Sequence, residues 1–236
     1  MPIIALAGGA SAADLRAHLA TPPVGNGPWP GVVVLHEALG LTADIRQQAD
    51  RLAAAGYLAV APDLFTGGGP LRCLKQTFTS LTRGEGPAVD DVLRVREWLL
   101  QRADCTGRVG VIGFCMGGGF ALLLAARGFD ASAPNYGPLP RDLGALDGAC
   151  PVVASYGARD HMMPKGIGAE LEAALQARGV PHDVKTYPGV GHSFLNRHGA
   201  GPFAVLERVV GLHFDEDVAQ DAWDRILRFF DEHLRG

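Results

Sequence analysis

The sequence lacks the features that mark several large classes of protein. Its 21 lysines and arginines are outnumbered by 25 aspartates and glutamates, which leaves a formal net charge of −4 at pH 7. Because this balance implies no basic surface, nucleic acid is not an expected partner. No apolar run approaches the roughly 18 residues of a membrane-spanning helix, so no membrane association is expected. The histidines and cysteines show no metal-ligand spacing, and neither a metal ion nor an organic cofactor is expected.

Disulfide bonds and a secretion signal are not indicated either. The four cysteines contain no CxxC motif, and a chain of 236 residues can bury enough apolar surface to fold without disulfides. We therefore expect reduced thiols and a cytoplasmic protein. The "ASA" at 10–12 superficially resembles a signal-peptide cleavage site, but no basic region precedes it and charged residues soon follow. The segment "DLRAHLATP" at 14–22 is instead predicted to be the first strand.

Strand and helix signals alternate along the chain. Short apolar runs such as "GVVVLHE" at 31–37 predict strands buried on both faces, and Thr42 is a good N-cap for the helical pattern that follows. The other predicted strands are 58–64, 108–114, 151–157 and 182–188, and the predicted helices are 42–57, 87–102, 116–127, 166–178 and roughly 216–234. This alternation predicts one α/β domain over residues 1–236, with a mostly parallel sheet and helices on both faces.

The segment 65–86 interrupts the alternation. It is rich in glycine at both ends and follows the predicted strand 58–64. In α/β folds, a long segment just past the carboxyl end of a strand often forms a lid or contacts the substrate. The alternative is a mobile surface loop with a short helix.

The motif "GFCMG" at 113–117 lies between a predicted strand and a predicted helix. It matches the G-x-nucleophile-x-G elbow, with Cys115 as the nucleophile. A side chain at Gly113 or Gly117 would collide with the neighbouring strand or helix. The free N–H groups and positive dipole end of the following helix favour a thiolate over a thiol. The alternative is a buried structural cysteine beside a tightly packed turn.

A thiol nucleophile needs a base, and two downstream residues are suitably placed. In α/β hydrolases the chain order is nucleophile, acid, histidine. Asp160 follows the predicted strand 151–157, and His192 follows the predicted strand 182–188 in a loop with flanking glycines. The order therefore favours Cys115, Asp160 and His192 as a catalytic set. The alternatives are that Asp160 caps the helix near 166 and that His192 is an exposed loop residue.

Five segments together resemble the dienelactone hydrolase family of the α/β-hydrolase fold, over nearly the whole chain. They are "VVVLHEALGL" (32–41), "GYLAVAPDLF" (56–65), "GFCMGGGFAL" (113–122), "YGARDHMMP" (156–164) and "YPGVGHSF" (187–194). The resemblance implies an α/β-hydrolase fold and a triad of Cys115, Asp160 and His192. It also implies that Glu37 lies beside the thiol and helps to deprotonate it when substrate arrives.

Glu37 is notable without the resemblance. A carboxylate at the end of an apolar strand is unfavourable unless it serves a site, and the alternative is a salt-bridged structural acid. The oxyanion of the reaction would be bound by two backbone N–H groups. We expect these to belong to Met116, directly after the nucleophile, and to Ala38, in the loop after the strand 31–37.

Substrate recognition is where the sequence departs from the family. Members that act on dienelactone are expected to hold its carboxylate with arginines. Arg197, shortly after His192, is one candidate for this role, and Arg72 and Arg83 in the segment 65–86 are the others. The alternative for all three is a solvated surface charge.

These observations predict a cysteine-dependent hydrolase of activated ester or lactone bonds, acting through a thioester on a small-molecule substrate. A first alternative is hydrolysis of activated phosphotriesters or a broad range of aryl esters by the same residues. A second is a thiol-based redox sensor in which Cys73 approaches Cys115. A third is an inactive binding module that retains the fold. We expect a monomer or a weak homodimer.

Overall fold

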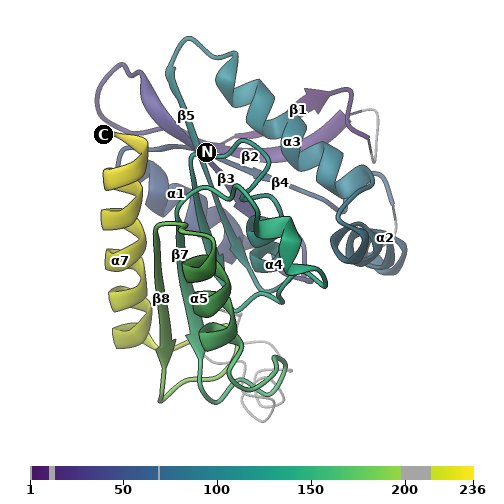
Figure 1. The fold of residues 1–236 in the computed structure, drawn as a ribbon. Helices are drawn as coiled ribbons and strands as arrows, with labels where there is room; N and C mark the ends of the chain where they lie inside the picture. The colour runs from purple at the N-terminus through teal and green to yellow at the C-terminus, as the bar shows by residue number, and fades with distance from the viewer. Residues whose placement is uncertain (1, 11–13, 69, 198–213) are drawn as a thin grey trace.

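The structure, a computed structural model, describes residues 2–10, 14–68, 70–197 and 214–236 (Figure 1). Within these residues, eight strands form one sheet in the order β1-β2-β4-β3-β5-β6-β7-β8. The strands β1 and β2 are antiparallel to their neighbours, and the others pair in parallel. This arrangement is the mostly parallel sheet that the alternating pattern predicts.

The strands are β1 (Ile3–Ala7), β2 (Asp14–Ala20), β3 (Trp29–Leu35), β4 (Leu58–Pro62), β5 (Cys105–Phe114), β6 (Ala131–Asn135), β7 (Val152–Gly157) and β8 (His182–Tyr187). The helices are α1 (Ala43–Ala54), α2 (Pro70–Arg83), α3 (Pro87–Leu100), α4 (Met116–Leu123), α5 (Ile167–Ala177) and α7 (Glu216–Leu234), with a 3₁₀ turn η1 at Leu143–Leu146. As predicted, the side chain of Thr42 caps α1 by accepting a hydrogen bond from the backbone N–H of Ile45.

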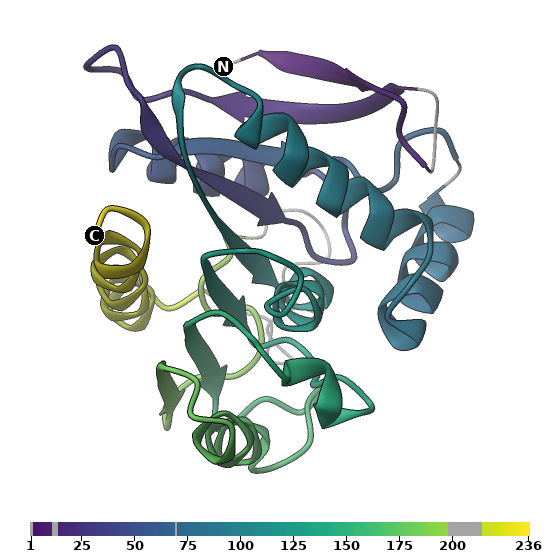
Figure 2. The same ribbon diagram turned by 45° about the horizontal axis from the view of Figure 1, so that its top comes forward.

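Helices cover both faces of the sheet (Figure 2). The apolar run of β3 shows how, because successive side chains point to opposite faces. Val32 and Val34 pack in a core with α1 and α7, whereas Val33 and Leu35 pack in a core with α3 and α4. The helix α5 covers the far end of the second face, over β7. No described helix is both long enough and apolar enough to cross a membrane.

Two strands were missed by the sequence analysis. The first, β1, pairs with β2 at the edge of the sheet. The second, β6, lies near the centre of the sheet between β5 and β7, although its sequence is "ASAPN" and Pro134 pairs with Gly113 in the register. Proline cannot donate to a ladder and normally argues against a central strand. Here full burial between two apolar strands outweighs the weak local preference.

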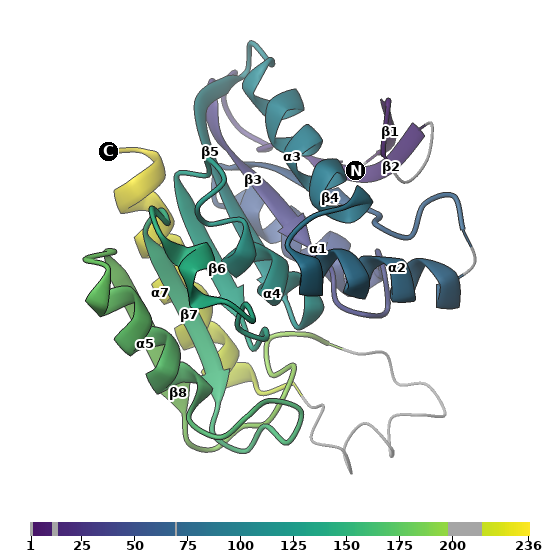
Figure 3. The same ribbon diagram turned by 45° about the vertical axis from the view of Figure 1, so that its right-hand side comes forward.

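The carboxyl ends of the parallel strands meet at one edge of the sheet (Figure 3). In the register, Leu35 of β3 lies opposite Gly113 of β5, and Gly157 of β7 lies opposite Tyr187 of β8. The loops that carry the predicted site residues therefore begin side by side. The segment 65–86 contains the 14-residue helix α2, which packs against α3 and α4 beside this edge.

Candidate active site

Cys115 occupies a strained turn between β5 and α4. Its φ is 54° and its ψ is −116°, a backbone conformation that residues other than glycine rarely adopt. A side chain at Gly113 would collide with the backbone of Gly117, and one at Gly117 would collide with the carbonyl oxygen of Leu35 at the end of β3. The two glycines therefore allow the close packing that the elbow motif predicts. The helix α4 begins at the next residue, so its N-terminus lies beside the thiol.

Asp160 and His192 form a buried pair. Nδ1 of His192 donates a hydrogen bond of 2.7 Å to Oδ2 of Asp160, and the imidazole is only 1% exposed. Oδ1 of Asp160 accepts a 2.7 Å hydrogen bond from the backbone N–H of Met162. The helix α5 has Gly166 as its N-cap, with no side-chain hydrogen bond. Neither alternative holds, because Asp160 does not cap that helix and His192 is not exposed.

A glycine at the end of β7 makes this pairing feasible. A side chain at Gly157 would collide with the carbonyl oxygens of Val190 and Gly191. The loop that carries His192 therefore lies directly on the end of β7, and the backbone N–H of Arg159 donates to the carbonyl of Val190 at 2.9 Å. This contact brings the imidazole of His192, in the loop after β8, to the carboxylate of Asp160, in the loop after β7.

The second nitrogen of the imidazole lies near the cysteine. Nε2 of His192 is buried and makes no hydrogen bond with the described residues. Burial lowers the pKa of His192, but the hydrogen bond to Asp160 and the nearby sulfur of Cys115 raise it, and the resulting pKa is about 9. At neutral pH the imidazole is therefore mostly cationic, and it lies within electrostatic reach of the thiol.

Glu37 lies at the same edge as Cys115. Because Leu35 pairs with Gly113, Glu37 and Cys115 each come two residues after paired positions of neighbouring strands. The Glu37 side chain is buried. Gly117 packs against the carbonyl oxygens of both Leu35 and His36, so the elbow touches the backbone that leads to Glu37.

His36 holds the loop that contains Glu37 and Ala38. Its Nδ1 donates to the carbonyl of Glu37 at 2.6 Å, and its Nε2 accepts from the backbone N–H of Leu64 at 3.0 Å. Burial lowers the pKa of His36, so the ring is neutral and can fill both roles. Ala38 lies in the turn closed by the hydrogen bond from Gly40 to Glu37. No sequence motif predicts this role for His36.

The two expected oxyanion donors come from different elements. Met116 is the first residue of α4, and the first N–H groups of a helix have no acceptor within the helix. Ala38 follows Glu37 in the loop after β3, against which the elbow packs. Met116 and Ala38 therefore lie one on each of the two backbone segments that pack together at Gly117.

Tyr136 is a site residue that the sequence analysis missed, because it follows the unrecognised strand β6. It is fully buried with a φ of 39°, and its ring meets the imidazole of His192 edge to face at 5.1 Å between centroids. Burial raises the pKa of Tyr136 well above its ordinary value, and nearby negative charges raise it further. The first of those charges are on Glu37 and Asp44.

The three candidate arginines do not gather at one place. Arg197 is 58% exposed, lies 4.0 Å over the ring of Phe214 and pairs with Glu216 at 3.1 Å. Arg72 and Arg83 instead line a groove of about 680 Å³ along α2 and the start of α3. None of these contacts involves Cys115. The proposal that the arginines bind substrate therefore rests only on their positions in the sequence.

The four cysteines are free thiols. Cys73 is buried in α2, and its sulfur donates a hydrogen bond of 3.4 Å to the carbonyl of Phe65. Its thiol is thus engaged with its own segment rather than presented to a partner. Within the part of the chain that the structure describes, no three His, Cys, Asp or Glu side chains form a group that could hold a metal ion.

The sheet order, the strained elbow and the buried His–Asp pair on the strand ends define an α/β-hydrolase fold. A family model described as the dienelactone hydrolase family matches residues 15–234. The chain belongs to the dienelactone hydrolase family.

Individual relatives agree with this assignment. A Yersinia pestis protein, provisionally named as a carboxymethylenebutenolidase, is 28% identical over 238 residues, which cover 93% of this chain and 84% of the relative. The crystal structure of a provisionally named dienelactone hydrolase from Klebsiella pneumoniae has a TM-score of 0.78 at 26% identity, covering 98% of this chain and 99% of that one. A dienelactone hydrolase-like promiscuous phosphotriesterase from metagenomic libraries has a TM-score of 0.82 at 23% identity, covering 98% of each chain, and is similar in fold.

Proposed function

We propose that the protein hydrolyses activated ester or lactone bonds of small molecules through a triad of Cys115, His192 and Asp160. The observation that carries the proposal is the buried 2.7 Å hydrogen bond between His192 and Asp160, with the second ring nitrogen, Nε2, near the elbow cysteine. Family membership supports hydrolysis, and the residue types support acyl transfer.

The first half-reaction transfers the acyl group to sulfur. Glu37 takes the proton of the Cys115 thiol, and the thiolate is stabilised by the imidazolium of His192. The thiolate attacks the carbonyl carbon, and the oxyanion accepts hydrogen bonds from the backbone N–H groups of Met116 and Ala38. The imidazolium then donates its Nε2 proton to the leaving alkoxide, the C–O bond breaks, and a thioester remains.

The second half-reaction needs the imidazole as a base. Once sulfur is acylated it carries no charge, so one of the causes that raise the pKa of His192 is gone. The neutral imidazole takes a proton from water, the hydroxide attacks the thioester, and the C–S bond breaks to release the acid with the thiolate and the imidazolium restored. Glu37 then returns its proton to the sulfur, which regenerates the starting state. Asp160 holds the tautomer with a proton on Nδ1 throughout.

The choice of sulfur limits the substrate. A thiolate needs less help from a base than an alkoxide does, but it is also expelled more readily from the tetrahedral adduct. Substrates with good leaving groups, such as enol lactones and aryl esters, therefore suit Cys115, and amides do not. The fold neighbour named as a phosphotriesterase is a reason to include an activated phosphotriester among the substrates assayed.

The test compares Cys115→Ala with Cys105→Ala, a free cysteine at the opposite end of the same strand. We expect Cys115→Ala to abolish hydrolysis of p-nitrophenyl acetate and of an enol lactone, and Cys105→Ala to retain it. We also expect mass spectrometry of a quenched reaction to find one acyl group on the peptide that contains Cys115. Undiminished turnover in Cys115→Ala would refute the proposal.

The redox alternative is tested on the same proteins. Peroxide should inactivate the wild type through Cys115, and a disulfide between Cys115 and Cys73 should not accumulate ahead of that inactivation. Rapid, reversible formation of this disulfide, together with no ester turnover, would favour the sensor instead.

A further inference from the structure

The loop that carries His192 is held from one side by the first two turns of α1. Oδ2 of Asp44 accepts a 2.6 Å hydrogen bond from the side-chain amide of Asn196, and Oδ1 accepts a 2.9 Å hydrogen bond from the backbone N–H of Arg197. Gln48, one turn further along α1, donates to the carbonyl of Leu195 at 3.0 Å. Three consecutive residues of the loop are therefore bonded to one helix.

A second set of contacts links this anchor to the imidazole. The carbonyl oxygen of the Asn196 side chain accepts a hydrogen bond from the hydroxyl of Tyr136. The ring of Tyr136 in turn meets the ring of His192 at 5.1 Å. Asn196 and Tyr136 are fully buried, and Asp44 is nearly so. The three residues, which we call the Asp44 clasp, thus connect α1 to the imidazole through direct contacts.

We propose that Asp44 is a positioning residue for His192, acting through Asn196 and Tyr136. The inference rests on the function proposed above. It adds to the proposed site a residue, Asp44, that contacts neither Cys115 nor the His192–Asp160 pair.

The chemistry of the clasp fixes the direction of every hydrogen bond. A carboxylate only accepts, so the amide group of Asn196 must turn its NH₂ toward Asp44. Its oxygen is then the only atom left to face Tyr136, whose hydroxyl must donate. Asp44 lies in the first turn of α1, where the helix dipole stabilises a negative charge. The charge at 44 therefore determines how the ring beside His192 is held.

The experiment exchanges the two groups that the clasp joins. In D44N the amide at 44 faces the amide of Asn196, and in N196D two carboxylates face each other. In the double variant D44N/N196D, the new carboxylate at 196 accepts from Tyr136 and from the new amide at 44, whose oxygen accepts from the backbone of Arg197. All the hydrogen bonds of the clasp are thereby restored, and the negative charge has moved from residue 44 to residue 196.

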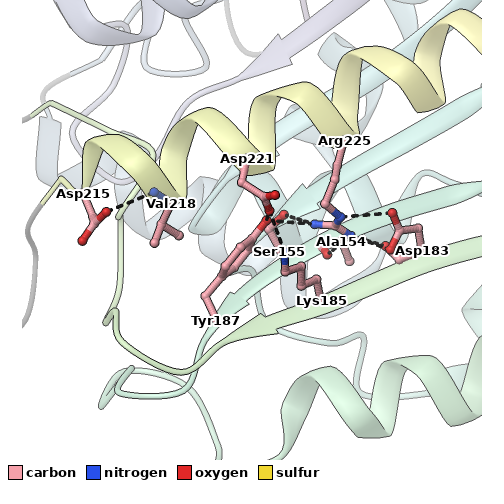
Figure 4. A network of polar contacts seen from close by, with 9 residues as sticks. All are labelled: Ala154, Ser155, Asp183, Lys185, Tyr187, Asp215, Val218, Asp221 and Arg225. Carbon is pink, nitrogen blue, oxygen red and sulfur yellow. Dashed lines mark hydrogen bonds and ion pairs between the residues drawn. The ribbon is translucent and has the colours of Figure 1, made fainter.

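We expect each single variant to lower kcat for p-nitrophenyl acetate by roughly 10- to 100-fold with little change in KM, because small displacements of a catalytic group are costly. The double variant should recover most of that loss. Asp183→Asn is the matched control, since it weakens the contact of the half-exposed Asp183 of β8 with the buried Arg225 (Figure 4) and should leave kcat unchanged. Kinetic constants are referred to the concentration of folded protein, measured by circular dichroism.

Wild-type kcat in D44N, or a double variant as slow as the singles, would overturn the inference. If D44N does not fold, Tyr136→Phe tests the same link, because it keeps the ring and removes the hydroxyl. An unchanged kcat in that variant would also overturn the inference. The two proposals fail separately: an active Cys115→Ala removes the proposed function, whereas an inactive Cys115→Ala beside a fully active D44N removes only the role of Asp44.

Discussion

Two polar networks join helices to the carboxyl-terminal half of the sheet, and they differ in what they hold. The Asp44 clasp joins α1 to the loop that follows β8. The second network, which we call the Arg225 network, joins α7 to the bodies of β7 and β8 (Figure 4). Its central residue, Arg225, is 7% exposed and donates to both side-chain oxygens and the carbonyl of Asp183. It also reaches Ser155 and Tyr187.

The difference lies in the chemistry of the central group and in its position. A guanidinium is a planar cluster of donors, which suits a group buried against several strand acceptors. The Arg225 guanidinium holds strands that are already paired by the backbone hydrogen bonds of the sheet. A carboxylate only accepts, and Asp44 gathers the donors of an irregular loop whose orientation no ladder specifies. We therefore expect the Arg225 network to govern stability and the Asp44 clasp to govern activity.

The two networks come into contact through Phe194. Its ring lies 5.3 Å from that of Tyr187 and 5.4 Å from that of Tyr136. This contact is packing between rings alone, and within the described residues no hydrogen bond joins one network to the other. Because a variant in one network can disturb the packing of the other, kinetic constants should be compared per folded molecule.

The largest effect on activity is expected at Asp160. Asp160→Asn removes the acceptor that fixes the Nδ1–H tautomer of His192, and we expect kcat to fall by roughly 10³-fold or more. The matched change Asp183→Asn in the Arg225 network should lower kcat less than about twofold. Steady-state hydrolysis of p-nitrophenyl acetate by both variants measures the difference. Equal losses would erase the distinction between the two regions.

The largest effect on stability is expected at Arg225. Arg225→Met leaves several buried acceptors on β7 and β8 without their donor, and we expect a loss of about 3–5 kcal/mol in the free energy of unfolding. Arg228→Met, at an exposed position of the same helix, should change it by less than about 0.5 kcal/mol. Urea denaturation measures both. A large fall in kcat per folded molecule of Arg225→Met would contradict the proposed division.

A smaller effect is expected from pH. The pKa of His192 is raised from 6.5 to about 9, so the folded protein binds this proton more tightly than the unfolded chain. That contribution to stability is complete below pH 6.5 and is lost as the pH rises through about 9, amounting to a few kcal/mol at most. The free energy of unfolding should thus fall more steeply over this range in the wild type than in Asp160→Asn. Parallel curves for the two proteins would show that the pair does not raise the pKa.

The smallest effect is expected at Lys185, on the exposed rim of the Arg225 network. Its ammonium group is 2.7 Å from Asp221, but both side chains are about half exposed. Lys185→Ala should therefore cost less than about 1 kcal/mol, and less still at high salt. Urea denaturation at two salt concentrations tests this. A loss as large as that of Arg225→Met would mean that the rim, not the guanidinium, holds the network together.

Local patterns were sufficient for much of the fold. Periodic apolar residues located the helices α1, α3, α5 and α7 to within a few residues, and short apolar runs located β3, β4 and β7. Segments with weak local preference were missed. The strand β6 has the sequence "ASAPN" and is a strand because β5 and β7 bury it from both sides. Tyr136 was missed for the same reason.

Local sequence and chain order specify which residues stand at the carboxyl ends of the strands. The glycines around Cys115, and the order of Cys115, Asp160 and His192, follow from steric and topological rules that act over a few residues or along the chain order. What lies across from each of these residues is set by tertiary packing. Asp44 meets Asn196 from a distant part of the chain, and Arg197 turns to Glu216 rather than to the thiol. No local pattern encodes such contacts, because they depend on how the loops pack once the sheet has formed.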